Sequence, residues 1–211
     1  MAQTKVRLKG TDIIRSDGGD GWHGDGWSHG HGALPIPTAR LGLWLFLGAV
    51  TMLFAAFSSA YLVRMPMPDW QSIPKPPILW VNTIVLLLSS VVAQWAWSSI
   101  RKGNEKGLRH GLLLAALLGV AFVAGQLWAW QQLVAVGVYL QSNPASSFFY
   151  LLTAMHGLHL LGGIVVLAWT TVRAWQNAYT PENHLGVELC VVYWHFLMLV
   201  WLWLFALLSL R

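Results

Sequence analysis

The sequence predicts an all-α, polytopic membrane protein: a bundle of five transmembrane helices with a disordered or extended N-terminal tail. Of its 211 residues, 56% are hydrophobic and only 10% are charged, whereas an ordinary soluble domain is roughly 25% charged. Five stretches are apolar and long enough to cross roughly 30 Å of hydrocarbon as helices. We expect them to form one transmembrane domain over 40–211. The spans are expected at about 41–63, 78–100, 111–140, 148–172 and 185–210.

Residues 1–39 are expected to form a polar, Gly/His-rich cytoplasmic tail. This segment has no helical or strand periodicity, and the stretch GGDGWHGDGWSHGHG at 18–32 is typical of a flexible chain. Its His23, His29 and His31 are weak candidates for a zinc or copper site, because neutral imidazole suits those ions. Ordering so many glycines around a metal costs conformational entropy. We therefore favour a linker over a metal site.

The first expected span, 41–63, carries small side chains at intervals of seven residues. Gly42, Ala49 and Ala56 therefore lie on one stripe of the helix. Small residues in such a stripe allow a neighbouring helix to approach closely. We expect a helix-packing contact here, with a partner that belongs either to this chain or to another subunit.

The second and third expected spans are defined mainly by their length and flanking residues. The second, 78–100, has Trp80 and Trp97 near its ends, where tryptophan anchors a helix at the membrane interface. The third, 111–140, is longer than a span requires. Its helix should therefore extend beyond the membrane or end near Gly137.

The fourth and fifth expected spans contain the ionisable groups of the membrane domain. His156 and His159 are three residues apart on the fourth, and Glu188 and His195 are nearly two turns apart on one face of the fifth. An unpaired charge in a span costs at least ~2.5–3.5 kcal/mol, so these groups need partners. Because the two spans run antiparallel, His159 and His195 both fall near mid-membrane. We predict a polar seam between these spans, with Glu188 near the cytoplasmic surface. His195 is expected to face His159 or His156.

Three interpretations of these polar residues differ in what they require. A haem site needs imidazoles facing each other across helices, and a two-haem bundle needs histidine pairs several turns apart, which no span has. A catalytic metal centre can combine histidines with a carboxylate, but a carboxylate-bridged dimetal site needs several acids, and the spans hold one. A hydrogen-bonded cluster that joins helices, or faces lipid, needs no further ligand. We favour this structural or lipid-facing cluster, with no catalytic residue: Glu188, His195, His156, His159, Tyr193 and Trp194.

The distribution of basic residues predicts the orientation in the membrane. With five spans the termini face opposite sides, and the positive-inside rule counts Lys and Arg close to the helix ends. The N-terminal side has Arg40, Arg101, Lys102, Lys106, Arg109 and Arg173, whereas the other side has only Arg64, Lys75 and Arg211. We expect a cytoplasmic N-terminus and a C-terminus outside. The net charge of +5 then reflects charged loops rather than a nucleic-acid surface.

The single cysteine, the missing nucleic-acid-binding motifs and the late first apolar run exclude several classes of protein. Cys190 is the only cysteine, so an intrachain disulfide and a dinuclear copper centre of the two-cysteine kind are both excluded. The basic stripes and stacking motifs of nucleic-acid-binding proteins are missing, so no nucleic-acid partner is expected. The first apolar run begins after about 40 polar residues, which is too late for a secretory signal peptide.

Five motifs together resemble subunit III of the haem-copper (cytochrome c) oxidases, in its short five-helix bacterial form. They occur in the family's order and cover nearly all of 40–211, and the Tyr-Trp-His-Phe block after Gly-x-Glu is the most specific. Glu188, His156, His159 and His195 match the family's positions. The motifs are ARLGLWLFLGAVTMLF (39–54), VNTIVLLLSSVVAQWA (81–96), GQLWAWQQL (125–133), FFYLLTAMHGLHLLGG (148–163) and HLGVELCVVYWHFLMLVWLWLF (184–205).

The resemblance implies a non-redox accessory subunit of a respiratory terminal oxidase in the bacterial plasma membrane. Such a subunit packs on catalytic subunit I and holds no haem or copper, because these lie in the partner subunits that reduce O2 to water and pump protons. The resemblance also implies bound phospholipid, support of proton uptake and slower inactivation during turnover. Two departures concern membrane carboxylates. Many members have Ser-Glu where this chain has Ala49-Val50, and Asp where it has Met198.

Two alternatives remain open at this point. Within the same fold, the chain would be an accessory subunit of a quinol oxidase or a nitric oxide reductase. From another class, an independent membrane metal-binding or carrier protein would use the tail and membrane histidines. Such a carrier should function and purify alone, whereas an accessory subunit should need its partners.

Overall fold

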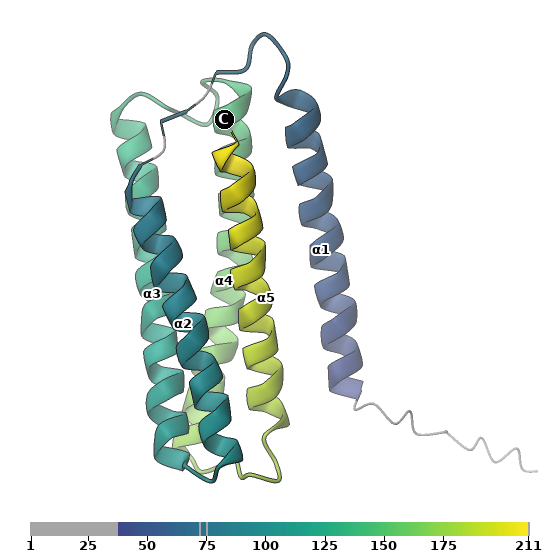
Figure 1. The fold of residues 1–211 in the computed structure, drawn as a ribbon, viewed down its shortest axis with the longest axis vertical. Coiled ribbons are helices and arrows are strands. Elements are labelled where there is room, and N and C mark those ends of the chain that lie inside the picture. Colours follow the sequence, from purple (N-terminus) through teal and green to yellow (C-terminus); the bar gives the residue numbers. More distant parts are fainter. Residues whose placement is uncertain (1–37, 72, 75, 211) are drawn as a thin grey trace, which may run out of the picture. The chain divides into compact units, whose positions relative to one another are not determined.

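The predicted all-helical class is confirmed by the structure, a computed structural model that describes residues 38–71, 73–74 and 76–210. Within these residues the chain forms five long helices, each apolar and long enough to cross a membrane. Consecutive helices run in opposite directions (Figure 1). Their bounds are α1 (Thr38–Arg64), α2 (Ile78–Arg101), α3 (Glu105–Ala135), α4 (Pro144–Trp175) and α5 (Leu185–Ser209).

The chain divides by its contacts into two units, Met1–Pro35 and Ile36–Arg211, and all five helices belong to the second. The tail histidines His23, His29 and His31 lie outside the described residues. Their assignment as weak metal candidates therefore stays a prediction.

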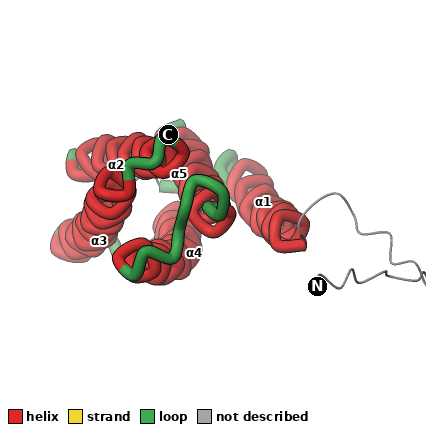
Figure 2. Tube along the Cα trace, turned by 90° about the horizontal axis from the view of Figure 1, so that it is seen from below, coloured by secondary structure: helices red, strands yellow, loops and turns green. Residues whose placement is uncertain are grey.

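Four helices form a bundle, and α1 packs on it from one side (Figure 2). Around the bundle, α2 contacts α3 and α5, and α4 contacts α3 and α5. α1 contacts α4 and α5, but within the described residues it makes no contact with α2 or α3. Since α5 touches α1, α2 and α4, its side chains face three different neighbours.

Two tryptophans of α5 occupy the centre of the bundle. Trp194 and Trp201 are seven residues apart on one face, and each is 1% exposed. Their indole N–H groups donate to hydroxyls of α2, Trp194 to Ser89 Oγ and Trp201 to Thr83 Oγ1, both at 3.0 Å. Leaving such a group buried without a partner costs about 1–3 kcal/mol. The two hydroxyls therefore help to fix the rotation of α5 about its own axis.

Asparagine caps explain two helix starts that differ from the expected spans. Asn104 accepts a hydrogen bond from a backbone N–H of the first turn at 2.9 Å, so α3 begins at residue 105 rather than near 111. Asn143 forms a capping box, with Pro144 in the first turn, so α4 begins before 148. Such caps satisfy N–H groups that have no partner inside the helix. α3 ends just before Gly137, whose φ of 80° suits glycine.

Candidate functional site

One end of the helices, here called the basic end, carries Arg40, Arg101, Lys102, Lys106, Arg109 and Arg173. Glu188 lies there, in the first turn of α5. Its Oε2 accepts a hydrogen bond from Nη2 of Arg40 on α1 at 2.8 Å. The side chains of Arg40 and Glu188 are 41% and 24% exposed, and an ion pair of this kind contributes roughly 0–1 kcal/mol. The carboxylate thus has a partner, which joins the start of α1 to the start of α5.

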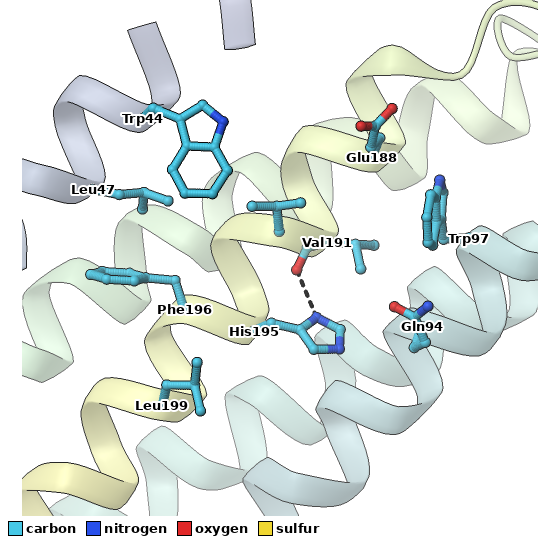
Figure 3. A pocket seen from close by; sticks show the side chains of 10 residues that line it. Trp44, Leu47, Gln94, Trp97, Glu188, Val191, His195, Phe196 and Leu199 are labelled. Atoms are coloured by element: carbon cyan, nitrogen blue, oxygen red, sulfur yellow. Dashed lines mark hydrogen bonds between the residues drawn. The ribbon is translucent and has the colours of Figure 1, made fainter. Parts of the chain in front are cut away.

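His195 lies nearly two turns further along the same face of α5, in a groove between α1 and α2 (Figure 3). Its Nδ1 donates to the carbonyl oxygen of Val191 at 2.8 Å. Because a carbonyl oxygen can only accept, Nδ1 carries the hydrogen and Nε2 of the neutral ring is left as an acceptor. The groove has a volume of about 290 Å³, and Trp44, Gln94 and Glu188 also line it.

The predicted polar seam between the fourth and fifth spans is wrong about which helices the polar face of the fifth span meets. The face with Glu188 and His195 lines the groove beside α1 and α2, and no residue of α4 lines that groove. Successive residues of a helix are rotated by about 100°. Trp194 bonds to α2 and Tyr193 bonds to α4, so the next residue, His195, is turned away from α4. The spacing shows which residues share a face, but it does not show which helix that face meets.

The two histidines of α4 lie in different surroundings. His156 is 0% exposed. It packs against Phe54, Phe122 and Trp201, with ring centroids 6.5, 6.1 and 5.3 Å away. Neither of its ring nitrogens has a hydrogen-bond partner among the described residues. His159 is half-buried, and its Nδ1 donates to the backbone carbonyl oxygen one turn earlier at 2.7 Å. His156 therefore joins α4 to α1, α3 and α5 by aromatic packing.

The six residues of the predicted cluster are thus distributed over several contacts. Tyr193 donates from its hydroxyl to the carbonyl oxygen of His159 at 3.0 Å, which links α5 to α4. Trp194 links α5 to α2, Glu188 pairs with α1, and His195 lies in the groove. In the described part of the chain, no group of three or more His, Cys, Asp or Glu side chains could hold a metal ion. The geometry brings together helices rather than catalytic groups.

A line of polar residues on α2 is structurally important and was not among the residues expected from the sequence. Thr83 and Ser89 accept the two indole N–H groups of α5, and Asn82 Nδ2 donates to Gln126 Oε1 of α3 at 3.2 Å. A signal was present. The pairs Asn82-Thr83 and Ser89-Ser90 are seven residues apart in an otherwise apolar run, which is typical of one polar helix face buried against other helices.

The stripe of small residues on α1 does not pack against the other described helices. Gly42, Ala49 and Ala56 are all exposed, and a Cβ added at Gly42 would meet nothing within 4 Å. The buried face of α1 carries Leu47, Val50, Phe54, Ser58 and Tyr61. A helix contact at the stripe therefore stays a prediction, and its partner would have to come from outside the described helices.

A larger pocket lies between α1, α4 and α5, toward the basic end. Its volume is about 700 Å³. Phe46, Val166 and Trp169 supply apolar walls, whereas Arg173 and Tyr179 supply polar groups. Burial raises the pKa of the Tyr179 hydroxyl above its ordinary value of 10.0, so this group stays protonated and can donate a hydrogen bond at neutral pH. The pocket is amphipathic, with a cation among its polar groups.

Comparison with known proteins identifies the family. Residues 23–210 match the family model described as cytochrome c oxidase subunit III. The chain belongs to this family. Cytochrome c oxidase subunit 3 of Synechocystis sp. is 35% identical over 188 residues, which cover 86% of this chain and 79% of the relative. The probable cytochrome c oxidase subunit 3 of Nocardia farcinica is 32% identical over 171 residues, or 79% of this chain and 84% of the relative.

The similarity extends to animals, since cytochrome c oxidase subunit 3 of Cyprinus carpio is 33% identical over 210 residues, or 92% of this chain and 75% of the relative. The resemblance carried by the five motifs is thereby confirmed. As a cytochrome c oxidase subunit III, the chain is a multi-pass membrane protein and part of a respiratory oxidase complex. This family carries no metal centre itself.

Proposed function

We propose that the chain is a non-redox accessory subunit that supports the catalytic subunit I of a haem-copper terminal oxidase during O2 reduction. It stabilises the catalytic subunit, holds phospholipid beside it and, through both effects, sustains proton uptake. Haem and copper belong to the partner subunits. The observation that carries this proposal is the amphipathic pocket between α1, α4 and α5.

The pocket suits a phospholipid. Arg173 lies in the last turn of α4 and lines the pocket, and a guanidinium binds a phosphate through two parallel hydrogen bonds. The hydroxyl of Tyr179 and the amide of Asn183 add hydrogen-bonding groups to the same pocket. Phe46 and Trp169 provide apolar surface for acyl chains. A ligand with an anionic head and apolar chains therefore matches both the polar and the apolar groups.

We place the basic end, and with it the N-terminus, in the cytoplasm of a bacterial cell, because loops rich in Lys and Arg stay on that side. Arg173 then lies beside the cytoplasmic leaflet, whose anionic lipids attract basic groups. Glu188 lies at the same surface, but its ion pair with Arg40 suits it to scaffolding. Support of proton uptake is therefore indirect, through lipid and helix position.

Purification of the tagged chain from its membrane tests the accessory role. We expect a haem-containing catalytic subunit and phospholipid to co-purify with it. We also expect cytochrome c, rather than a quinol, to reduce the purified complex, which identifies the electron donor. Reduction by a quinol, or nitric oxide reductase activity, would favour the alternative complexes. A chain that purifies alone with stoichiometric metal would instead support the carrier hypothesis.

A pair of variants at the basic end tests the lipid site. Arg173→Gln should lower the phospholipid retained per complex, because the phosphate loses its charged partner. Lys102→Gln removes a charge at the same end from an exposed residue that does not line the pocket, so lipid content should not change. Equal lipid content in both variants, measured by mass spectrometry, would show that the pocket does not hold the lipid.

A further inference from the structure

A continuous groove runs along α5 on the side that the bundle leaves open. The groove with His195 and a second pocket of about 560 Å³ share Phe196 and Leu199. The first part lies between α1 and α2, and the second lies between α1 and α5. Both α1 and α2 contact α5, but they make no contact with each other among the described residues, so neither of them closes the groove along α5.

Polar groups without partners line this groove inside the apolar part of the helices. Gln94 is exposed, and among the described residues its amide makes no hydrogen bond. It lies seven residues before the end of α2, which is about 10 Å along the helix axis. Trp97 also lines the groove, nearer the end of α2, but its Nε1 is buried within the chain, where an incoming helix cannot reach it. The Nε2 of His195 adds an acceptor (Figure 3).

The wall of the groove that α1 contributes allows another helix to approach α1 closely. Thr51, Ala55 and Ser59 line the second part of the groove, and their spacing of four residues places them on one face of α1. Small residues at this spacing let two helix backbones come together in a membrane. This face is distinct from the stripe through Gly42, Ala49 and Ala56.

We propose that this groove receives one transmembrane helix of the oxidase's catalytic subunit, with a hydroxyl or amide side chain opposite Gln94 and His195. The inference rests on the proposed accessory function. A helix side chain of this kind can donate to the Nε2 of His195 and accept from the Gln94 amide. An acyl chain has no hydrogen-bonding group at this depth, so a lipid tail would leave both the Gln94 amide and the His195 Nε2 unsatisfied. Polar side chains inside a membrane normally bond across helices.

Photocrosslinking in the purified complex tests the proposal. Leu199 lines both parts of the groove and is 59% exposed, and Leu117 on α3 is 58% exposed but lies outside the groove. A photoreactive leucine analogue at 199 should crosslink to the catalytic subunit, whereas the same analogue at 117 should not. A label found only on lipid at 199, or equal protein crosslinking from both positions, would overturn the proposal.

A substitution provides a second measurement. Gln94→Leu should lower retention of the chain in detergent-washed complex by about threefold, the order expected for one interhelical hydrogen bond. The thermal stability of the isolated chain should not change, because the Gln94 side chain makes no hydrogen bond with the residues that the structure describes. Unchanged retention would contradict the proposal. If the catalytic subunit does not co-purify even with the unaltered chain, the accessory function itself fails, which is a separate outcome.

Discussion

Substitution of Gly119 by alanine should destabilise the helix bundle through one close contact. Gly119 lies on α3 against Trp194, and a Cβ at this position would lie 2.8 Å from both Cη2 and Cζ2 of the indole ring. The ring cannot move away freely, since its Nε1 is bonded to Ser89 Oγ at 3.0 Å and the side chain is 1% exposed. Forcing an extra carbon into a packed core costs typically about 1–3 kcal/mol.

A glycine on α4 supplies the matched control. A Cβ at Gly157 would meet nothing within 4 Å, so Gly157→Ala keeps the gain in helix propensity of roughly 1 kcal/mol without the clash. Because both variants replace a helical glycine by alanine, the propensity term cancels in their difference. Gly119→Ala should therefore be about 1–3 kcal/mol less stable than Gly157→Ala.

Thermal unfolding of the purified chain in detergent, followed by circular dichroism, measures this difference. A change of 1 kcal/mol corresponds to roughly 2–4 °C for a chain of this size. A third variant identifies the cause. Trp194→Phe removes the two ring atoms that clash, so Gly119→Ala should cost less in that background. Equal melting temperatures for Gly119→Ala and Gly157→Ala, or no rescue by Trp194→Phe, would refute the reasoning.

Four further outcomes are expected. Trp201→Phe should cost about 1–3 kcal/mol, because the buried Thr83 hydroxyl loses the N–H group that it accepts, whereas Trp128→Phe should cost less because Trp128 is 57% exposed and its indole makes no hydrogen bond with the described residues; melting temperatures compare the two. Arg40→Gln and Glu188→Gln each remove the ion pair between α1 and α5, so each should increase hydrogen exchange at the start of α1. The increase should be smaller in about 1 M salt, and the double variant should exchange no faster than either single variant. Deletion of residues 1–30 should leave assembly intact in a pull-down assay, because all the described helices lie beyond that segment. The isolated chain should bind neither haem nor copper, as measured by absorption spectra and metal analysis. A haem absorption band or stoichiometric metal would contradict this prediction.

The close contacts at the centre of the bundle were outside the reach of sequence reasoning. The aromatic surroundings of His156 combine residues from α1, α3 and α5, and no pattern in one helix indicates such a combination. The partner of Glu188 is 148 residues away in the chain. The polar face of α2 was the exception, because the repetition of Asn82-Thr83 seven residues later as Ser89-Ser90 was visible in the sequence.

By itself, the sequence determined the number of helices, their approximate limits and the family. Helix length and apolar content follow from local composition, and the motifs around Glu188 and His195 were specific enough to identify subunit III. Only the tertiary structure decided how each helix is rotated. Inside a membrane the bundle interior and the surrounding lipid are both apolar, so hydrophobicity does not mark the buried face as it does in water. Contacts such as Trp194 with Ser89 fix that rotation, and they turn Glu188 and His195 toward α1 and α2 rather than α4.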